Sequence, residues 1–188
     1  MAAAENGSIQ PQSALIFLGT GCSSAVPNAL CLIRPSDPPC TVCSQSLTVP
    51  PEENRNYRCN TSLLIDYCKD NGAHKYIIFR EQVLRWFSHY RIPQVDSNFF
   101  NDKGPATAVP HLGFLYTRYA TDGSHKVHLC LTQTLEALKM LCPKRALLIG
   151  MTHEFDHHKD NEFLEEWSRR EGIAVQLAHD GLRVPFNL

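Results

Sequence analysis

Three histidines and two acidic residues are concentrated in residues 152–158, Thr-His-Glu-Phe-Asp-His-His. They follow directly after the apolar run 146–150, which is typical of a buried strand that ends in glycine. His153 and His157 lie four residues apart, so they share one face of a helix or converge within one loop. The alternative is a solvated loop at a helix N-terminus, where Asp156 would be a good cap. Three histidines at a strand end favour a metal site.

A second candidate set of metal ligands lies nearer the N-terminus. Cys40 and Cys43 have the Cys-x-x-Cys spacing that allows two thiolates to bind one tetrahedral Zn²⁺, with a histidine from elsewhere supplying a nitrogen. Cys31 precedes them in the same proline-rich segment, 26–53, in which we expect a stapled loop without regular structure. The alternative is that these are ordinary thiols, and the spacing alone leaves both interpretations open.

Other motifs are weaker. His125 and His128 precede an expected helix, and one of them could be a general acid or base, although surface histidines are common. The segment Gly19-Thr20-Gly21 could bind phosphate through backbone amides. Because no Lys-Ser/Thr follows it, we interpret it as a tight turn. No Gly-x-Ser-x-Gly elbow is present, so the sequence does not support a serine hydrolase.

The composition sets broad limits. With 188 residues and 43% apolar residues, the chain is expected to form one domain over 13–188 after a disordered tail at 1–12. A net charge of -1 gives no basic surface for nucleic acid or an anionic membrane. We see no signal peptide or membrane span and expect a cytoplasmic protein, in which the eight cysteines are thiols or metal ligands.

The expected elements alternate in a way that indicates a layered α/β or α+β fold. Apolar runs and turn residues predict strands at 13–18, 58–66, 75–78, 145–150, 173–177 and 182–186, and helices at 79–90, 131–141 and 161–171. Between residues 94 and 125 the local signals conflict, and only 111–116 resembles a strand. The join from Ile78 to Phe79 has no turn or capping residue.

Both ends of the chain resemble the metallo-β-lactamase superfamily, in the branch of the phosphonate-pathway cyclic phosphodiesterase and similar plant hydrolases. The residues that carry this resemblance are 18–27, Cys40-x-x-Cys43, 60–66, 125–129, 151–153 and 180–182. The resemblance covers 14–90 and 111–188. It implies an αββα sandwich, here only partial, with a dinuclear Zn or Mn centre at which a bridging water attacks the phosphodiester of a small molecule.

The resemblance also assigns catalytic roles. It implies that His153 is the last ligand of the dinuclear centre and that His128 is a general acid near the leaving group. The family's His-x-His-x-Asp-His motif is absent, since no histidine stands between His89 and His111. We therefore expect a shortened chain with little or no hydrolase activity, or else a non-catalytic zinc-stapled domain.

A separate structural zinc site is implied by the same resemblance. Cys40 and Cys43 match two of its thiolates, and Cys31 would replace a third one across an insertion. His157 matches the histidine ligand of this site. An alternative register of the two sequences places His153 at the structural zinc instead.

Overall fold

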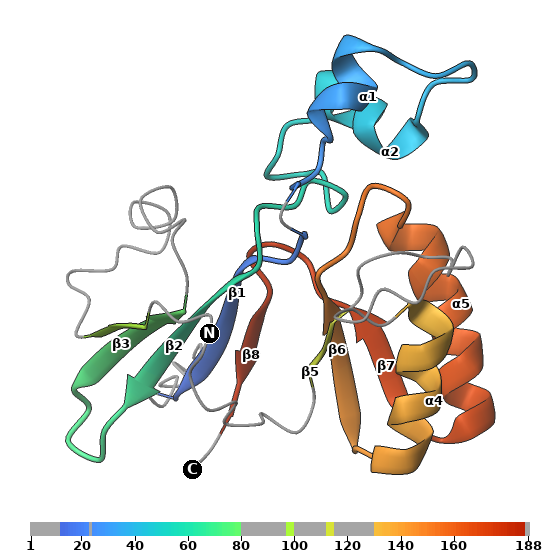
Figure 1. Ribbon diagram of the computed structural model, residues 1–188. Helices are drawn as coiled ribbons and strands as arrows, with labels where there is room; N and C mark the ends of the chain where they lie inside the picture. The colour runs from blue at the N-terminus through green and yellow to red at the C-terminus, as the bar shows by residue number, and fades with distance from the viewer. Residues whose placement is uncertain (1–11, 23, 80–96, 100–111, 115–129, 187–188) are drawn as a thin grey trace, which may run out of the picture.

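A computed structural model describes residues 12–22, 24–79, 97–99, 112–114 and 130–186 (Figure 1). These residues form a five-stranded sheet in the order β4-β3-β2-β1-β8 and a three-stranded sheet in the order β5-β6-β7. The larger sheet contains β1 (Ala14–Gly19), β2 (Ser62–Cys68), β3 (His74–Phe79), β4 (Ser97–Phe99) and β8 (Arg183–Pro185). The smaller sheet contains β5 (Leu112–Phe114), β6 (Arg145–Ile149) and β7 (Ala174–Leu177). Antiparallel and parallel pairs occur together, which confirms the predicted mixed α/β class.

An apolar cluster joins the two sheets. Phe17 of β1 packs with Leu147 and Ile149 of β6, and all three are at most 4% exposed. Leu63 of β2 and Val184 of β8 pack against the same cluster. Alternate residues of a strand point to opposite faces, so one face of each sheet supplies this cluster. The sheets therefore form the two central layers of a sandwich.

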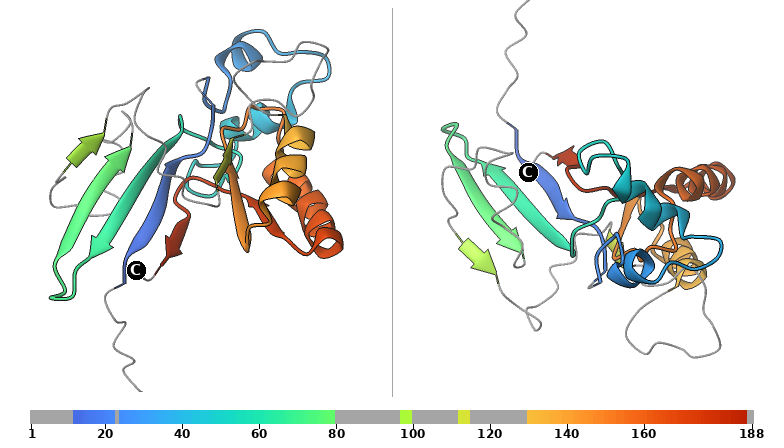
Figure 2. Two further views of the ribbon diagram at one scale, coloured as in Figure 1. Left: turned by 60° about the horizontal axis from the view of Figure 1, so that its bottom comes forward. Right: turned by 90° about the horizontal axis from the view of Figure 1, so that it is seen from above.

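Two helices form a third layer. α4 (Leu131–Leu141) and α5 (His157–Glu171) cover the face of the smaller sheet that is turned away from the larger one (Figures 1 and 2). α4 has the predicted bounds and ends at Cys142, which has a left-handed φ of 45°. α5 begins earlier than the predicted residue 161, because the Asp156 carboxylate caps it by accepting the amides of His158 and Lys159.

The segment 26–58, here called the cysteine lobe, projects beyond the ends of both sheets (Figure 1). It contains α1 (Ala29–Ile33), α2 (Thr41–Ser44) and the 3₁₀ helix η1 (Gln45–Leu47). The prediction of no regular structure over 26–53 was therefore wrong. Asn28 caps α1 by accepting the amide of Leu30 at 2.9 Å, and each helix is too short to produce a periodic pattern in the sequence.

Several expectations fall outside the described residues. These are the tail except for its last residue, the helix at 79–90 except for Phe79, most of the segment 94–125, and His128. Within the described residues no helix is both long enough and apolar enough to cross a membrane. The predicted strands at 173–177 and 182–186 correspond to β7 and β8, and the turn between them connects strands of different sheets.

The carboxylate of Asp180 joins three segments. Its Oδ1 accepts the backbone amide and the hydroxyl of Thr20, both at 2.8 Å, and its Oδ2 accepts the amide of Cys59 at 2.7 Å. Gly19 is required beside it, since a Cβ there would lie 2.0 Å from the carbonyl oxygen of Asn60. The amide of Gly21 donates to the carbonyl of Cys59. With the amides of Thr20 and Gly21 engaged in this way, the segment is not a phosphate cradle. The predicted tight turn is not formed either: Gly19 ends β1, and Gly21 forms isolated bridges with Asn60 and Met151.

Replacement of Asp180 by Asn should destabilise the protein by about 2 kcal/mol, because the new amide would point a donor at another buried donor. The measurement is chemical denaturation at neutral pH. Asp70→Asn is the matched control, since Asp70 is exposed in the turn between β2 and β3. Equal stability of the two variants would contradict this role of Asp180.

Candidate metal centre

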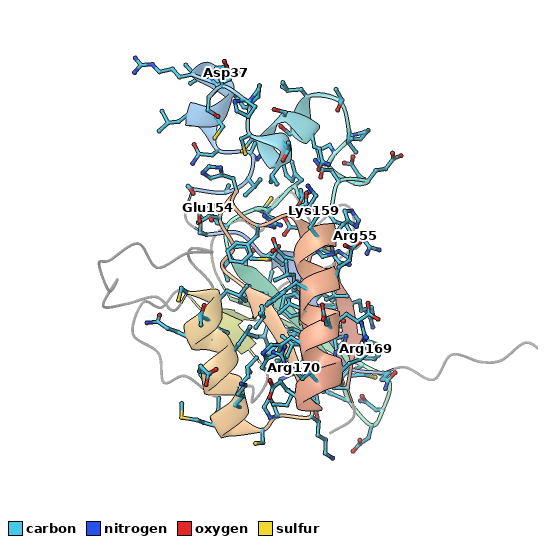
Figure 3. The ribbon with its side chains drawn as sticks, turned by 90° about the vertical axis from the view of Figure 1, so that its right-hand side faces the viewer. Asp37, Arg55, Glu154, Lys159, Arg169 and Arg170 are labelled. Carbon is cyan, nitrogen blue, oxygen red and sulfur yellow. The ribbon has the colours of Figure 1, made fainter. Side chains whose placement is uncertain are left out.

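Three cysteines and one histidine converge between the cysteine lobe and the body of the protein. The four residues are Cys31, Cys40, Cys43 and His153, and their possible ligand atoms all lie within 4.8 Å of one another. Cys31 belongs to α1, Cys43 to α2 and Cys40 is the N-cap residue of α2, whereas His153 belongs to the loop between β6 and α5. Figure 3 shows this loop, marked by Glu154, directly beneath the lobe. The cluster therefore joins segments that are more than a hundred residues apart in the sequence.

The spacing of the donor atoms matches tetrahedral coordination. The Nδ1 atom of His153 lies 3.5 Å from Cys31 Sγ and 3.5 Å from Cys40 Sγ. With Zn–S bonds of about 2.3 Å and Zn–N bonds of about 2.0 Å, a tetrahedral ion separates a sulfur from a nitrogen by about 3.5 Å. Soft thiolates with one imidazole favour Zn²⁺ over hard cations. The residues therefore fit a zinc ion bound through His153 Nδ1.

Local structure explains how the cysteines are positioned. Cys40 is the N-cap residue of α2 and Cys43 lies within its first turn, so the two side chains lie on the same side of the helix. The backbone amide of Asn28 donates to Cys43 Sγ at 3.3 Å, which favours a thiolate there. Val26 and Val42 pack around Cys43 in a small apolar cluster.

Without a bound cation, deprotonation of these thiols is unfavourable. Burial raises the pKa of the Cys43 thiol to about 12, and the hydrogen bond from Asn28 only partly offsets this effect. Burial also raises the pKa of Cys31, and nearby Cys40 adds to that shift. A bound divalent cation reverses this balance because it stabilises the thiolates directly. The cluster is therefore suited to a metal ion and unsuited to free thiolates.

The structure separates the two candidate histidines. His153 lies with the cysteines, as in the alternative register of the two sequences. His157 is not part of this group. The reason is the early start of α5: His157 is its first residue and is buried beside Asn161, whereas His153 remains in the preceding loop. Cys31, a weaker expectation, does lie in the cluster.

Arg58 is a structural residue that the sequence analysis missed. Its guanidinium is fully buried and donates to the carbonyl oxygens of Thr152 and Phe155 at 3.1 and 3.0 Å. It also donates to Asn56 Oδ1, which accepts the amide of His157 at 2.7 Å. Burial lowers the pKa of Arg58 to about 10, so it remains charged at neutral pH. Arg58 therefore holds the His153 loop in place at the base of the lobe.

In the part of the chain that the structure describes, this is the one group of three or more potential metal ligands. The candidate general acid, His128, lies outside that part. The four residues of this group could together hold one metal ion, and four protein ligands would leave no open position for a substrate or water.

The purified protein should contain about one zinc per chain, and His153→Ala should weaken zinc binding by more than tenfold, roughly, because even outer hydrogen-bonding partners of zinc ligands contribute that much. His158→Ala is the control, since His158 is exposed nearby in the sequence and is not in the cluster. Competition with a chromophoric chelator measures both affinities. Equal weakening by the two substitutions would contradict the assigned ligand.

Zinc binding near neutral pH should release at least two protons, roughly, because raised pKa values keep the thiols of Cys31 and Cys43 protonated in the metal-free protein. Affinity should therefore rise with pH. Calorimetric titrations in two buffers of different ionisation enthalpy count the protons. Release of fewer than one would show that these thiols are not ligands.

Comparisons with known proteins support the fold. The chain matches no protein-family model and no curated protein. Among solved structures it is similar to a diphosphatase described as a new member of the PhnP family, with a TM-score of 0.54 and 16% sequence identity over 94% of this chain and 99% of the other. A second solved structure, Zn²⁺-bound PqqB from Methylobacterium extorquens, gives a TM-score of 0.27 and 14% identity over 90% of this chain and 46% of the other. The first likeness shows a fold of the metallo-β-lactamase type.

Proposed function

We propose that this protein is a zinc-stapled form of a phosphodiesterase-like fold, in which one structural Zn²⁺ fixes the cysteine lobe and hydrolytic activity is weak or absent. The observation that carries the proposal is the convergence of Cys31, Cys40, Cys43 and His153, whose ligand atoms lie within 4.8 Å of one another and include two nitrogen–sulfur separations of 3.5 Å. Four protein ligands complete the coordination of zinc, which is characteristic of structural sites.

The weak packing of the cysteine lobe supports a structural role for the metal. α1 buries none of its residues, and Leu30 and Ile33 are 68% and 74% exposed. The buried apolar cluster of the lobe consists of Val26, Val42 and Cys43. This small number of buried side chains provides little hydrophobic stabilisation. Metal coordination must therefore supply much of the folding free energy of the lobe.

Removal of zinc should therefore unfold the lobe and leave the sandwich folded. Hydrogen exchange with and without a chelator tests this. We expect the amides of Ser44 and Val49 in the lobe to lose protection, because both bond to carbonyls within it. The amide of Leu64 in β2 is the internal control. Unchanged protection of the lobe after verified zinc removal would contradict the proposal.

The hydrolase part of the proposal draws on the fold and on the sequence. The similar solved structure is a diphosphatase, which suggests a small phosphate ester as the substrate class of the fold. Two metal ions close together would orient and activate a water for attack on such a substrate. The chain lacks His-x-His-x-Asp-His, and His153 lies with the cysteines. We therefore infer that this chain cannot form the complete dinuclear centre.

Purified protein of this sequence should not turn over bis(p-nitrophenyl) phosphate, even with added Mn²⁺ or Zn²⁺. The assay is steady-state release of nitrophenolate. The zinc content of His153→Ala tests the zinc staple separately from the activity assay, because the proposed staple depends on His153. Sustained turnover by the unmodified protein would overturn the inference of weak activity, whereas zinc content would still report on the staple.

We further propose that the chain is a shortened product of a longer message, present in a reducing compartment. The missing motif and the abrupt join at Phe79 support the first point. The second is supported by the eight cysteines, none of which forms a disulfide. Sequencing the transcript decides the first point: a message with an intact His-x-His-x-Asp-His between Ser97 and His111 would show that this sequence is an artefact.

A further inference from the structure

The three cysteines of the metal cluster differ in how easily solvent reaches them. Cys31 and Cys40 are half-buried, whereas Cys43 is only 1% exposed. Cys43 lies within the apolar cluster of the lobe, and its sulfur accepts the backbone amide of Asn28. The lobe itself projects beyond the ends of both sheets, so solvent surrounds most of it (Figure 1). A dissolved oxidant therefore reaches Cys31 and Cys40 more readily than Cys43.

The two half-buried cysteines are also neighbours. Their sulfurs lie 3.5 Å from the same atom, His153 Nδ1, and within 4.8 Å of each other. The side chains of Cys31 and Cys40 are close enough to share a hydrogen bond. Both cysteines belong to the lobe, whose few buried apolar residues resist small movements weakly. Rotation of these two side chains can therefore bring the sulfurs into bonding distance while the sandwich stays in place.

Zinc coordination would make these sulfurs reactive toward oxidants. A cysteine bound to zinc is a thiolate, and the thiolate is the form of cysteine that attacks an oxidant. Cys142 provides a contrast, because it is exposed but lies outside the cluster. Its sulfur donates a hydrogen bond to the carbonyl oxygen of Lys139 at 2.9 Å, which requires the protonated thiol. Exposure alone therefore does not give Cys142 the reactivity of the cluster.

We propose that hydrogen peroxide converts Cys31 and Cys40 of the zinc-loaded protein into a disulfide and that the lobe thereby loses its metal. This inference rests on the zinc staple proposed above. One thiolate sulfur attacks a peroxide oxygen and breaks the O–O bond, which gives a sulfenic acid and hydroxide. The second thiolate displaces hydroxide from the sulfenic sulfur and forms the S–S bond. The two thiolates lose two electrons in all, and the peroxide takes up two protons and becomes two water molecules.

The disulfide leaves Cys43 and His153 as the remaining ligands of the cluster. Two ligands do not hold a structural zinc ion, which takes four. The lobe then unfolds, because its apolar contacts are few. Arg58 keeps the His153 loop on the sandwich through its hydrogen bonds to Thr152 and Phe155. Thiol reductants reverse the disulfide by exchange, so the cluster acts as a reversible peroxide-sensitive switch of the lobe.

The test adds hydrogen peroxide in steps to the zinc-loaded full chain, together with a chromophoric chelator too weak to remove zinc from the untreated protein. We expect release of about one zinc ion per chain. Mass spectrometry after alkylation should find a disulfide between Cys31 and Cys40, with Cys43 alkylated. Cys142→Ser should release zinc at the unchanged rate, since Cys142 is outside the cluster.

Cys31→His is the variant that separates oxidation from simple loss of a ligand. Histidine also binds zinc, so the zinc content of this variant before oxidation verifies that its site is intact. Peroxide should release this zinc several-fold more slowly, because the shielded Cys43 is then the partner that Cys40 must use. A dithiol reductant added with zinc should restore the loaded lobe of the unmodified protein.

Three results would overturn the proposed switch and leave the zinc staple standing. The first is zinc that stays bound while peroxide oxidises Cys142. The second is zinc release with a disulfide between Cys40 and Cys43, or between two chains through Cys142. The third is release from Cys31→His at the rate of the unmodified protein. Absence of zinc from the untreated protein is a separate outcome, which would contradict the staple and the switch together.

Discussion

The convergence of three thiols and one imidazole is the constraint on which the cysteine lobe depends. Sulfur atoms buried this close together are costly as thiolates, and burial raises the pKa of Cys43 to about 12. A bound zinc ion would stabilise the thiolates through coordination bonds, and the 3.5 Å separation of His153 Nδ1 from two sulfurs matches the geometry of such bonds. The lobe has few buried apolar residues with which to replace them.

Behind the cluster, buried polar groups hold the loop that carries His153. Arg58 binds two carbonyls of this loop, and its own strand-like segment pairs with Val26 at the base of the lobe. Asp180 joins Thr20 to the chain just after Arg58. The hydrogen bonds of Arg58 and the contacts of His153 with the cysteines therefore hold the same loop against the base of the lobe.

Local signals in the sequence were sufficient for much of the fold. The helix Leu131–Leu141 was predicted with correct bounds because its leucines repeat at helical spacing and Pro143 follows it. The strands at 58–66 and 75–78 were predicted from apolar runs and turn residues, and they pair as β2 and β3 around a turn in which Gly72 has a φ of 77°. The short helices of the lobe were missed because neither completes a hydrophobic period.

The candidate metal ligands were all named from the sequence, but which histidine lies with the cysteines was not decided. The choice between His153 and His157 depends on where α5 begins, and this is decided by the Asp156 cap and by contacts with Asn56, more than a hundred residues away. No local pattern contains that contact. The orientation of the Asn161 side chain is likewise set from outside its helix, because the amide of Leu177 in β7 donates to its Oδ1.

X-ray absorption at the zinc edge of the purified full chain tests the central claim most directly. The account predicts three sulfurs at about 2.3 Å and one nitrogen at about 2.0 Å, with the imidazole signal lost in His153→Ala. A coordination shell dominated by oxygen and nitrogen, or one in which the imidazole signal persists in that variant, would contradict the account.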